Sequence, residues 1–337
     1  MVIVVTGAYG FIGSNIVKAL NQLGYTDIIA VDNLKNGAKF TNLVDCEILD
    51  YVDKEDFIRA IVDGDYDNQV DYIFHQGACS DTTHPDGKYM MHNNYEYSCL
   101  LLEYAQKNQV PLLYASSAAT YGSKTDFIEE LAYEGPLNVY GYSKFLFDQV
   151  VRRYYASGLS APVVGLRYFN VYGDREAHKE RMASVVYHNF KQLQANGKVK
   201  LFEGCQGYGN GEQVRDFISI YDVVKVNLFF FNNHVNDVEE ISGIFNCGTG
   251  KSRSFNDLAL STINAYRKLK DQLNPLSLKD ACVQGVIEYI PFPSDLAGRY
   301  QCYTQANLDN LHACGYGEEF LSLESGVEKY VEHLLKQ

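Results

Sequence analysis

Three glycines near the start of the chain, Gly7, Gly10 and Gly13, restrict the possible folds more than any other feature. They follow a short apolar run at residues 2–5, and the last of them lies at the start of an amphipathic stretch at residues 12–23. This order predicts a buried strand, a tight turn and a helix, because glycine permits the turn and lets the helix pack closely on the strand. The N-terminus of a helix placed in this way is suited to binding an anion.

Apolar runs and amphipathic stretches go on alternating up to about residue 170. The sequence predicts strands at residues 2–5, 28–31, 72–74, 112–115 and 163–169, and helices at residues 12–23, 55–62, 89–106 and 140–155. Strands that alternate with helices form βαβ units, in which helices cover both faces of a parallel sheet. The predicted fold class is therefore α/β, with a doubly wound parallel sheet.

An acidic residue, Asp32, ends the strand that follows the glycine turn. It lies at the sequence distance where an acidic side chain meets the adenosine ribose of a dinucleotide, so the chain is predicted to bind NAD or NADP. Asp32 alone favours NAD, because a carboxylate repels a 2′-phosphate. Asn33, Lys35 and Lys39 follow at once and are placed to reach that phosphate, so we favour NADP and keep NAD as the alternative.

The regular pattern changes after residue 170 into irregular, Gly-rich and charged stretches, with one more strand expected at residues 244–247. Open α/β sheets bind ligands at the carboxyl ends of their strands, so a second lobe is expected to cap that edge. We therefore predict an NADP-binding domain and a smaller C-terminal substrate-binding lobe. The first takes residues 1–170 with a returning segment at 216–250, and the second takes residues 171–215 and 251–337.

Composition argues against several classes of partner. The chain has 29 Lys and Arg against 42 Asp and Glu, and a net charge of −13 disfavours binding to nucleic acid or to an anionic membrane. No apolar run approaches the roughly 18 residues that a membrane span needs. The eight cysteines include no C-x-x-C pair, so their spacing suggests neither a zinc ribbon nor a redox dithiol. We expect a cytoplasmic protein with reduced thiols and no metal site.

A candidate catalytic pair, Tyr140 and Lys144, has the spacing Y-x-x-x-K. The same spacing recurs at three other places, namely Tyr187/Lys191, Tyr221/Lys225 and Tyr266/Lys270. Position distinguishes the first pair, because Tyr140 opens a predicted helix and Ser117 ends the strand before it. One helical turn places Tyr140 and Lys144 on the same face. A cationic Lys144 is expected to lower the pKa of the phenol and favour a phenolate that can accept a hydroxyl proton.

The glycine spacing and the Ser, Tyr and Lys residues together resemble the extended branch of the short-chain dehydrogenase/reductase superfamily. That resemblance implies that Ser117 hydrogen-bonds the reacting oxygen and that Tyr140 is the acid/base. It also implies that Lys144 holds the nicotinamide ribose.

Longer stretches resemble one family, the ADP-glyceromanno-heptose 6-epimerases. They include TGAYGFIGSNIVKAL, DNLKNGAKFTNL, HQGACSDTT, YASSAATYG, PLNVYGYSKFLFD, GLRYFNVYG, LFEG and EYIPFPSDLAGRYQCYTQA, and they run from near Met1 to about Asn307. The resemblance implies an isomerase that oxidises carbon 6 of an ADP-linked heptose with bound NADP and then reduces it from the opposite face. Such an enzyme supplies heptose for the lipopolysaccharide core, and the resemblance further implies a homo-oligomer, a pentamer.

The same resemblance implies the residues of the site, with Lys179 as a second acid/base beside the cofactor. The implied cofactor residues are Gly7, Gly10, Phe11, Ile12, Gly13, Asp32, Asn33, Lys39, Lys54, Gln76, Gly77, Ala78, Cys79, Ser80, Asn93, Lys144, Val171 and Lys179. The implied substrate residues are Ser117, Asn170, Arg181, His188, Phe202, Glu203, Gly204, Cys205, Arg215 and Tyr300.

The chain departs from this family pattern at several positions. Arg181 stands where a small hydroxyl residue is expected against the substrate, and Gln76 stands where an acidic residue is expected. Two segments, 206–213 and 268–284, are longer than the pattern. The substrate side of the site therefore departs further from the family than the cofactor side does.

Three other functions were weighed. A nucleotide-sugar 4,6-dehydratase needs an acidic pair just after the serine position, whereas Ser117 is followed by Ala118, Ala119 and Thr120, which argues against it. A UDP-sugar 4-epimerase uses the same Ser, Tyr and Lys and stays open as the alternative. A non-enzymatic NAD(P)-binding scaffold also stays open, and it requires the Tyr140 and Lys144 pair to be idle.

Overall fold

The computed structural model describes residues 1–270, 274–293 and 301–337. Its main sheet has seven strands in the order β10-β6-β5-β4-β1-β2-β3, and every neighbouring pair is parallel. The strands are β1 (Ile3–Thr6), β2 (Ile28–Asp32), β3 (Asp50–Asp53), β4 (Tyr72–His75), β5 (Leu112–Ser117), β6 (Val163–Tyr168) and β10 (Gly243–Cys247). The order reverses between β1 and β4, as in a Rossmann fold, which confirms the predicted fold class.

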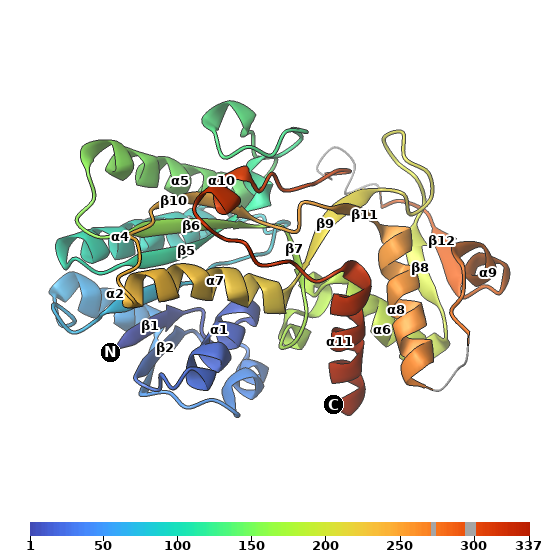
Figure 1. Ribbon diagram of the computed structural model, residues 1–337, viewed down its shortest axis with the longest axis horizontal. Helices are drawn as coiled ribbons and strands as arrows, with labels where there is room; N and C mark the ends of the chain where they lie inside the picture. The colour runs from blue at the N-terminus through green and yellow to red at the C-terminus, as the bar shows by residue number, and fades with distance from the viewer. Residues whose placement is uncertain (271–273, 294–300) are drawn as a thin grey trace.

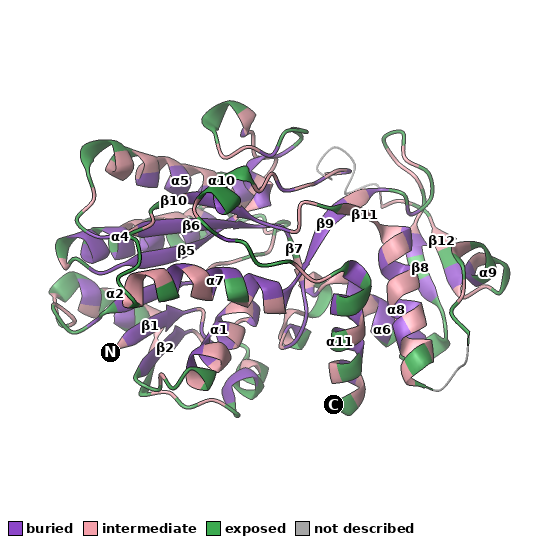
Figure 2. Cartoon of the chain, viewed as in Figure 1, coloured by how far each residue is buried: buried purple, intermediate pink, exposed green. Residues whose placement is uncertain are grey.

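Helices cover both faces of this sheet (Figure 1). One face packs against α1 (Phe11–Gln22) and α7 (Ile220–Val235), and the other against α2 (Lys54–Asp63), α4 (Tyr97–Lys107) and α5 (Val139–Ser157). Successive side chains of a strand point to opposite faces, so Ile3 and Val5 join the first core and Val4 joins the second. Figure 2 shows the inner strands of this sheet as buried. Because helices cover both of their faces, these strands appear in the sequence as continuous apolar runs.

The predicted helix at residues 89–106 is interrupted. It consists of α3 (Gly87–Met91), a π-helical turn at His92–Glu96 and then α4. A π-helical turn widens the backbone locally and is frequent at functional sites. Here it carries Asn93, which lines the cleft described below.

The chain beyond residue 170 is more regular than predicted. It contains α6 (Val185–Asn196), α8 (Phe255–Leu269), α9 (Leu278–Val283) and α11 (Leu323–Lys336), and the strands β7 (Asn170–Tyr172), β8 (Val199–Phe202), β9 (Val214–Ser219), β11 (Ser252–Ser254) and β12 (Ile287–Ile290). The prediction of an irregular region is wrong for these elements. Its strands are mostly short, and its helices bury their apolar faces mainly against one another, so no long buried strand marks the region.

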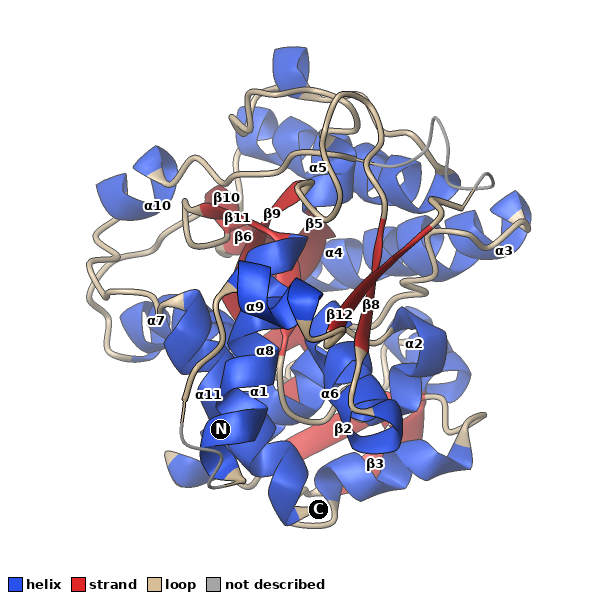
Figure 3. Cartoon of the chain, turned by 90° about the vertical axis from the view of Figure 1, so that its right-hand side faces the viewer, coloured by secondary structure: helices blue, strands red, loops and turns tan. Residues whose placement is uncertain are grey.

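Two small sheets and a helical core build this second part of the molecule. β9 lies between β11 and β7 in one sheet, and β8 pairs with β12 in the other, where the two strands run side by side (Figure 3). Phe190 of α6, Leu258 of α8 and Val327 of α11 pack together in a common core.

The segment before α11 returns to the large sheet. Leu311, in α10 (Asp309–Ala313), and Tyr316 belong to the core beneath α1 and α7. The chain therefore crosses back over β10 before it forms α11, and the division into two lobes stays a prediction. Among the helices that the structure describes, none is both long and apolar enough to cross a membrane.

Candidate active site

A cleft of about 1160 Å³ opens at the carboxyl ends of the large sheet's strands. Asp32 of β2, Ser117 of β5 and Tyr168 of β6 line it on the sheet side, and Phe202 of β8 and Arg215 of β9 line it on the other. Its position next to the reversal of strand order is where open α/β sheets bind ligands.

The glycine turn encloses a space that would be filled if its glycines carried side chains. Gly7 has φ +66°, and a Cβ atom added to it would lie 2.7 Å from the backbone nitrogen of Gly77. A Cβ atom on Gly13 would lie 2.2 Å from the carbonyl oxygen of Gly7. Gly10 begins α1 without a capping side chain, so the first amides of that helix remain available to an anion. These residues fit the pyrophosphate of a nicotinamide dinucleotide.

The adenosine end of the cleft contains an ion pair. The Asp32 carboxylate, only 6% exposed, accepts a hydrogen bond from the backbone N–H of Tyr9 at 3.0 Å and pairs with the Lys39 ammonium. Lys39 also donates to the carbonyl oxygen of Asn33 at 3.3 Å. Lys39 therefore offsets the negative charge that would otherwise repel a phosphate at this end.

Ser117 and Tyr140 meet at the reacting end. Ser117 is the last residue of β5, and Tyr140 is the second residue of α5, whose N-terminus is capped by the Asn138 side chain at the backbone N–H of Gly141. Burial raises the pKa of the Tyr140 phenol, and its hydrogen bond with Ser117 opposes that rise. The predicted lowering of this pKa by Lys144 is thus wrong, because burial outweighs the other influences on the phenol.

Lys144 is anchored to the strand that carries Ser117. Its side chain is buried, and its ammonium donates a hydrogen bond to the carbonyl oxygen of Ala115 at 2.8 Å. Burial lowers the pKa of Lys144 to about 8, and the negative charge of Asp148, one helical turn further along α5, acts in the opposite direction.

Asp148 belongs to a buried network of charges that the sequence did not predict. Its carboxylate accepts hydrogen bonds from Tyr114 and Ser116, both at 2.9 Å, and from the Arg167 guanidinium at 2.8 and 3.0 Å. Arg167 also pairs with Glu134 at 2.5 Å. A fully buried arginine needs such partners, because an unpaired charge is costly in the interior.

The other three Y-x-x-x-K pairs lie away from the cleft. Tyr187, Tyr221 and Tyr266 are absent from the cleft's lining residues, and the Tyr221 hydroxyl instead donates to the Asp174 carboxylate at 2.6 Å. The structure therefore places only Tyr140 and Lys144, of the four pairs, at the site.

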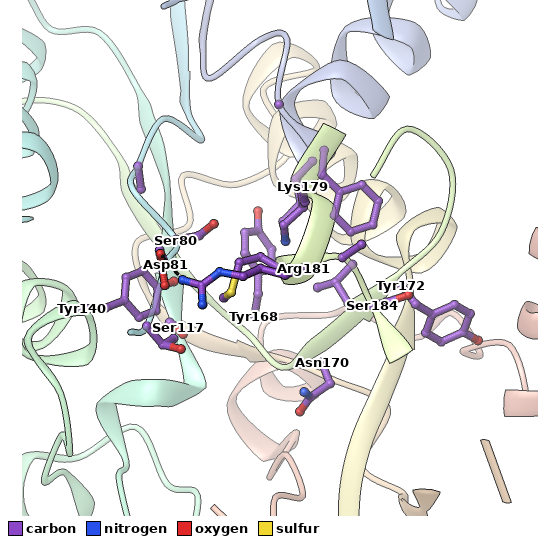
Figure 4. A pocket seen from close by; sticks show the side chains of 18 of the residues that line it. Ser80, Asp81, Ser117, Tyr140, Tyr168, Asn170, Tyr172, Lys179, Arg181 and Ser184 are labelled. Atoms are coloured by element: carbon purple, nitrogen blue, oxygen red, sulfur yellow. Dashed lines mark hydrogen bonds and ion pairs between the residues drawn. The ribbon is translucent and has the colours of Figure 1, made fainter. Parts of the chain in front are cut away.

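The wall opposite Tyr140 carries two basic side chains from the 3₁₀ segment Ala177–Met182 (Figure 4). Burial lowers the pKa of the Lys179 ammonium, and the nearby Glu176 carboxylate opposes this. Arg181 extends across the cleft and donates to the Asp81 carboxylate at 3.0 Å and the Thr83 hydroxyl at 2.9 Å. Glu180, between the two, has φ +50°, a strained backbone that fixes the direction of its neighbours.

Nearly all of the predicted site residues line this one cleft. They comprise every predicted cofactor residue, together with Ser117, Tyr140, Asn170, Arg181, His188, Phe202 and Arg215. Glu203, Gly204 and Cys205 do not line it, because the chain turns away from the cleft after Phe202. Tyr300 and part of the long segment 268–284 lie outside the described residues, whereas the long segment 206–213 is the loop that leads into β9.

Sequence reasoning missed several residues that line the cleft. Asp81 is the partner of Arg181, and the Tyr168 hydroxyl donates to the Gln76 side chain at 3.0 Å. Asn189 is only 1% exposed, and its amide nitrogen has no hydrogen-bond partner within the described part of the chain. The stretch GLRYFNVYG could have indicated Tyr168, whereas no local pattern marks Asp81 or Asn189.

Comparison with known proteins agrees with this geometry. The model of the NAD dependent epimerase/dehydratase family matches residues 3–248. The chain belongs to this family. The matched region contains the glycine turn, Ser117, Tyr140 and Lys144, and it ends just after β10. Membership of the NAD dependent epimerase/dehydratase family makes the chain an enzyme of that class with a nicotinamide dinucleotide site.

Solved structures of this family share the fold over the whole chain. The Helicobacter pylori ADP-L-glycero-D-manno-heptose-6-epimerase is 30% identical with a TM-score of 0.76, covering 100% of this chain and 96% of that one. The Thermotoga maritima UDP-glucose 4-epimerase is 26% identical with a TM-score of 0.75, covering 100% and 99%. The Methanobrevibacter ruminantium UDP-N-acetylglucosamine 4-epimerase, at 23% identity and a TM-score of 0.79 over 100% and 98%, shares the fold.

Proposed function

We propose that this enzyme inverts carbon 6 of the heptose in ADP-D-glycero-D-manno-heptose, giving ADP-L-glycero-D-manno-heptose for the lipopolysaccharide core. One observation carries the proposal: Tyr140 and Lys179 enter the same cleft from opposite walls. Inversion by oxidation and reduction must transfer a proton at the carbon 6 oxygen in two orientations of the sugar, and two acid/base groups on facing walls meet that need. The 30% identity to an ADP-heptose 6-epimerase supports this substrate.

Gly7, Gly10 and Gly13 would hold the pyrophosphate of the dinucleotide, whose nicotinamide, when bound, would supply a hydride acceptor that can later return the hydride. Tyr140 must first lose its own proton, and its phenolate then accepts the proton of the carbon 6 hydroxyl, while Ser117 holds the reacting oxygen by a hydrogen bond. The keto-sugar then turns within the cleft and presents its other face. As the hydride returns to that face, the Lys179 ammonium, whose pKa is lowered by burial, donates a proton to the carbon 6 oxygen. Arg215, only 5% exposed at the cleft wall, is placed to bind the diphosphate of the substrate.

NADP is the cofactor that we propose. The ion pair between Asp32 and Lys39 supports it, since it reduces the repulsion that Asp32 alone would exert on a 2′-phosphate. Lys54 also lines the cleft.

A second candidate is a UDP-sugar 4-epimerase, which the TM-score of 0.75 and 26% identity to the Thermotoga maritima enzyme favour. Side-by-side assays separate the two. ADP-D-glycero-D-manno-heptose, UDP-glucose and UDP-N-acetylglucosamine are supplied to the purified enzyme, and the products are identified by NMR. We expect kcat/KM for the heptose to exceed that for either UDP-sugar by about 100-fold or more. Faster inversion of carbon 4 in a UDP-sugar would replace the proposal with the second candidate.

A further inference from the structure

Two cysteines that are distant in the sequence are neighbours in space near the start of β9. The sulfur atoms of Cys205 and Cys302 lie 3.7 Å apart, although the residues are 97 positions apart in the chain. All eight cysteines are free thiols in this structure. Sequence spacing gave no sign of this pair, since neither cysteine belongs to a C-x-x-C pattern.

Both thiols are held in place by their surroundings. Cys205 lies in the loop at residues 203–213, where the Gln213 side chain donates to its sulfur at 3.4 Å. Cys302 is fastened to β9, because its carbonyl oxygen accepts a hydrogen bond from the backbone N–H of Val214 at 3.0 Å. Its thiol donates to the Gln206 side chain at 3.1 Å. The short distance between the sulfurs is therefore supported by contacts on both sides.

We propose that Cys205 and Cys302 form a redox-active dithiol, whose oxidation by a peroxide joins the loop at residues 203–213 to the segment at residues 301–304 through a disulfide. The proposal does not depend on which sugar the enzyme converts.

The geometry needs only a small movement. Bonded sulfurs in a disulfide are about 2.05 Å apart, so the two atoms have to approach by less than 2 Å. Rotation of the two side chains, together with a small shift of the Gly-rich loop that carries Cys205, supplies such a movement. Gly207 and Gly211 both have positive φ in that loop, at +86° and +66°.

The two thiols have different roles because their environments differ. Cys302 is only 8% exposed, whereas Cys205 is half-buried. Burial raises the pKa of Cys302 to about 11, the hydrogen bond with Cys205 adds to the rise, and Arg215 opposes it. Cys302 therefore keeps its proton at neutral pH, and Cys205 is the thiol that meets the oxidant first.

The chemistry balances with hydrogen peroxide as the oxidant. The Cys205 thiolate attacks one peroxide oxygen, so that an S–O bond forms, the O–O bond breaks and hydroxide leaves. The product at Cys205 is a sulfenic acid. The Cys302 sulfur then gives up its proton and attacks the Cys205 sulfur, so that the S–S bond forms and the S–O bond breaks. In total, two thiols and one peroxide give one disulfide and two waters.

A metal site is a weaker explanation of the pair. Structural zinc sites use four ligands from Cys, His and acidic residues. No group of three or more such residues is close enough to hold a metal ion within residues 1–270, 274–293 and 301–337. The pair is thus better suited to disulfide chemistry than to metal binding.

Peptide mapping of the folded, full-length enzyme tests the proposal. The enzyme is treated with hydrogen peroxide, remaining thiols are alkylated, and peptides are analysed by mass spectrometry without reduction. We expect a loss of two of the eight thiols, a peptide linking Cys205 to Cys302, and full recovery of thiols with dithiothreitol. Cys205→Ser should abolish the link, whereas Cys46→Ser, at another half-buried thiol, should leave it intact.

Two results would overturn the proposal. One is oxidation of Cys205 to sulfinic acid without a link to Cys302. The other is a mixture in which Cys205 is linked to several cysteines in similar amounts, because that would show that the fold does not select the pair.

Discussion

The ammonium nitrogen of Lys144 lies 2.8 Å from the carbonyl oxygen of Ala115, which joins α5 to β5 two residues before Ser117. This bond fixes Lys144 and the strand that carries Ser117 relative to each other. Burial lowers the pKa of Lys144 to about 8, with Asp148 opposing the shift. The charge of Lys144 therefore changes close to neutral pH.

The pH dependence of turnover should report on Lys144. Because its pKa lies near 8, the ammonium is present below that pH and is lost as the pH rises through it, so kcat should fall above about pH 8. Asp148→Asn removes the negative charge that opposes the lowering of this pKa, so the alkaline limb should move to lower pH. The measurement is kcat against pH for both proteins.

Glu134→Gln is the matched control for this shift. Glu134 pairs with the same Arg167 that Asp148 contacts, but it is not among the groups that shift the pKa of Lys144. The control should lose stability without moving the alkaline limb. An unmoved limb in Asp148→Asn would show that Asp148 does not act through Lys144.

Tyr140→Phe should retain the fold and lose turnover. The substitution keeps the ring and removes the hydroxyl that transfers the proton, so kcat is expected to fall by about 100-fold or more. Tyr187→Phe is the control, since Tyr187 has the same spacing to a lysine but lies outside the cleft. Circular dichroism confirms folding and a product assay gives kcat. Wild-type turnover in Tyr140→Phe would show that the Tyr140 hydroxyl does not transfer the proton.

Cofactor preference should depend on Lys39. Lys39→Met leaves the Asp32 carboxylate without its ion-pair partner, so a 2′-phosphate meets an uncompensated negative charge. The ratio of Kd for NADP to Kd for NAD, measured by calorimetry, should rise by roughly tenfold or more. Lys35, which the sequence placed within reach of this phosphate, is exposed and does not line the cleft, so Lys35→Met is the control and should leave the ratio unchanged. An unchanged ratio in Lys39→Met would mean that the 2′-phosphate is not bound here.

Arg215→Ala should raise KM for the nucleotide sugar. Loss of a charged hydrogen bond to the diphosphate predicts an increase of roughly tenfold to a hundredfold, with the amount of co-purified cofactor unchanged. Arg253 is opposite Arg215 in the β11–β9 pairing, but it forms ion pairs with Asp257 and Glu324. Arg253→Ala should therefore keep KM within about twofold. If Arg215→Ala instead loses its cofactor, Arg215 binds the pyrophosphate of the cofactor and not the diphosphate of the substrate.

The cofactor half of the site was predictable because its residues are close in sequence. The glycine turn, Asp32 and the Tyr140–Lys144 pair each lie within one strand–turn–helix unit, where spacing determines relative position. Ser117 could be added because the strand that it ends adjoins the helix of Tyr140. Such local patterns also predicted the strands and helices of the first half, except for β3, which the prediction missed because its sequence DYVD is partly exposed and has no apolar run.

The substrate side could not be predicted as fully, because it depends on contacts between distant segments. Arg181 and Asp81 are 100 positions apart, and Cys205 and Cys302 are 97 positions apart. Sequence spacing carries no information on such pairs, because only the fold brings the two residues together. The pKa of Tyr140 was missed for a related reason, since the extent of burial depends on the whole cleft.

The source of the hydrogen at carbon 6 tests the central claim most directly. ADP-D-glycero-D-manno-heptose is converted in D₂O, and the carbon 6 position of the product is examined by NMR and mass spectrometry. Inversion by oxidation and hydride return predicts the L-glycero epimer with protium at carbon 6, because the hydrogen never exchanges with solvent. Deuterium at carbon 6, or failure to form the epimer, would contradict the account.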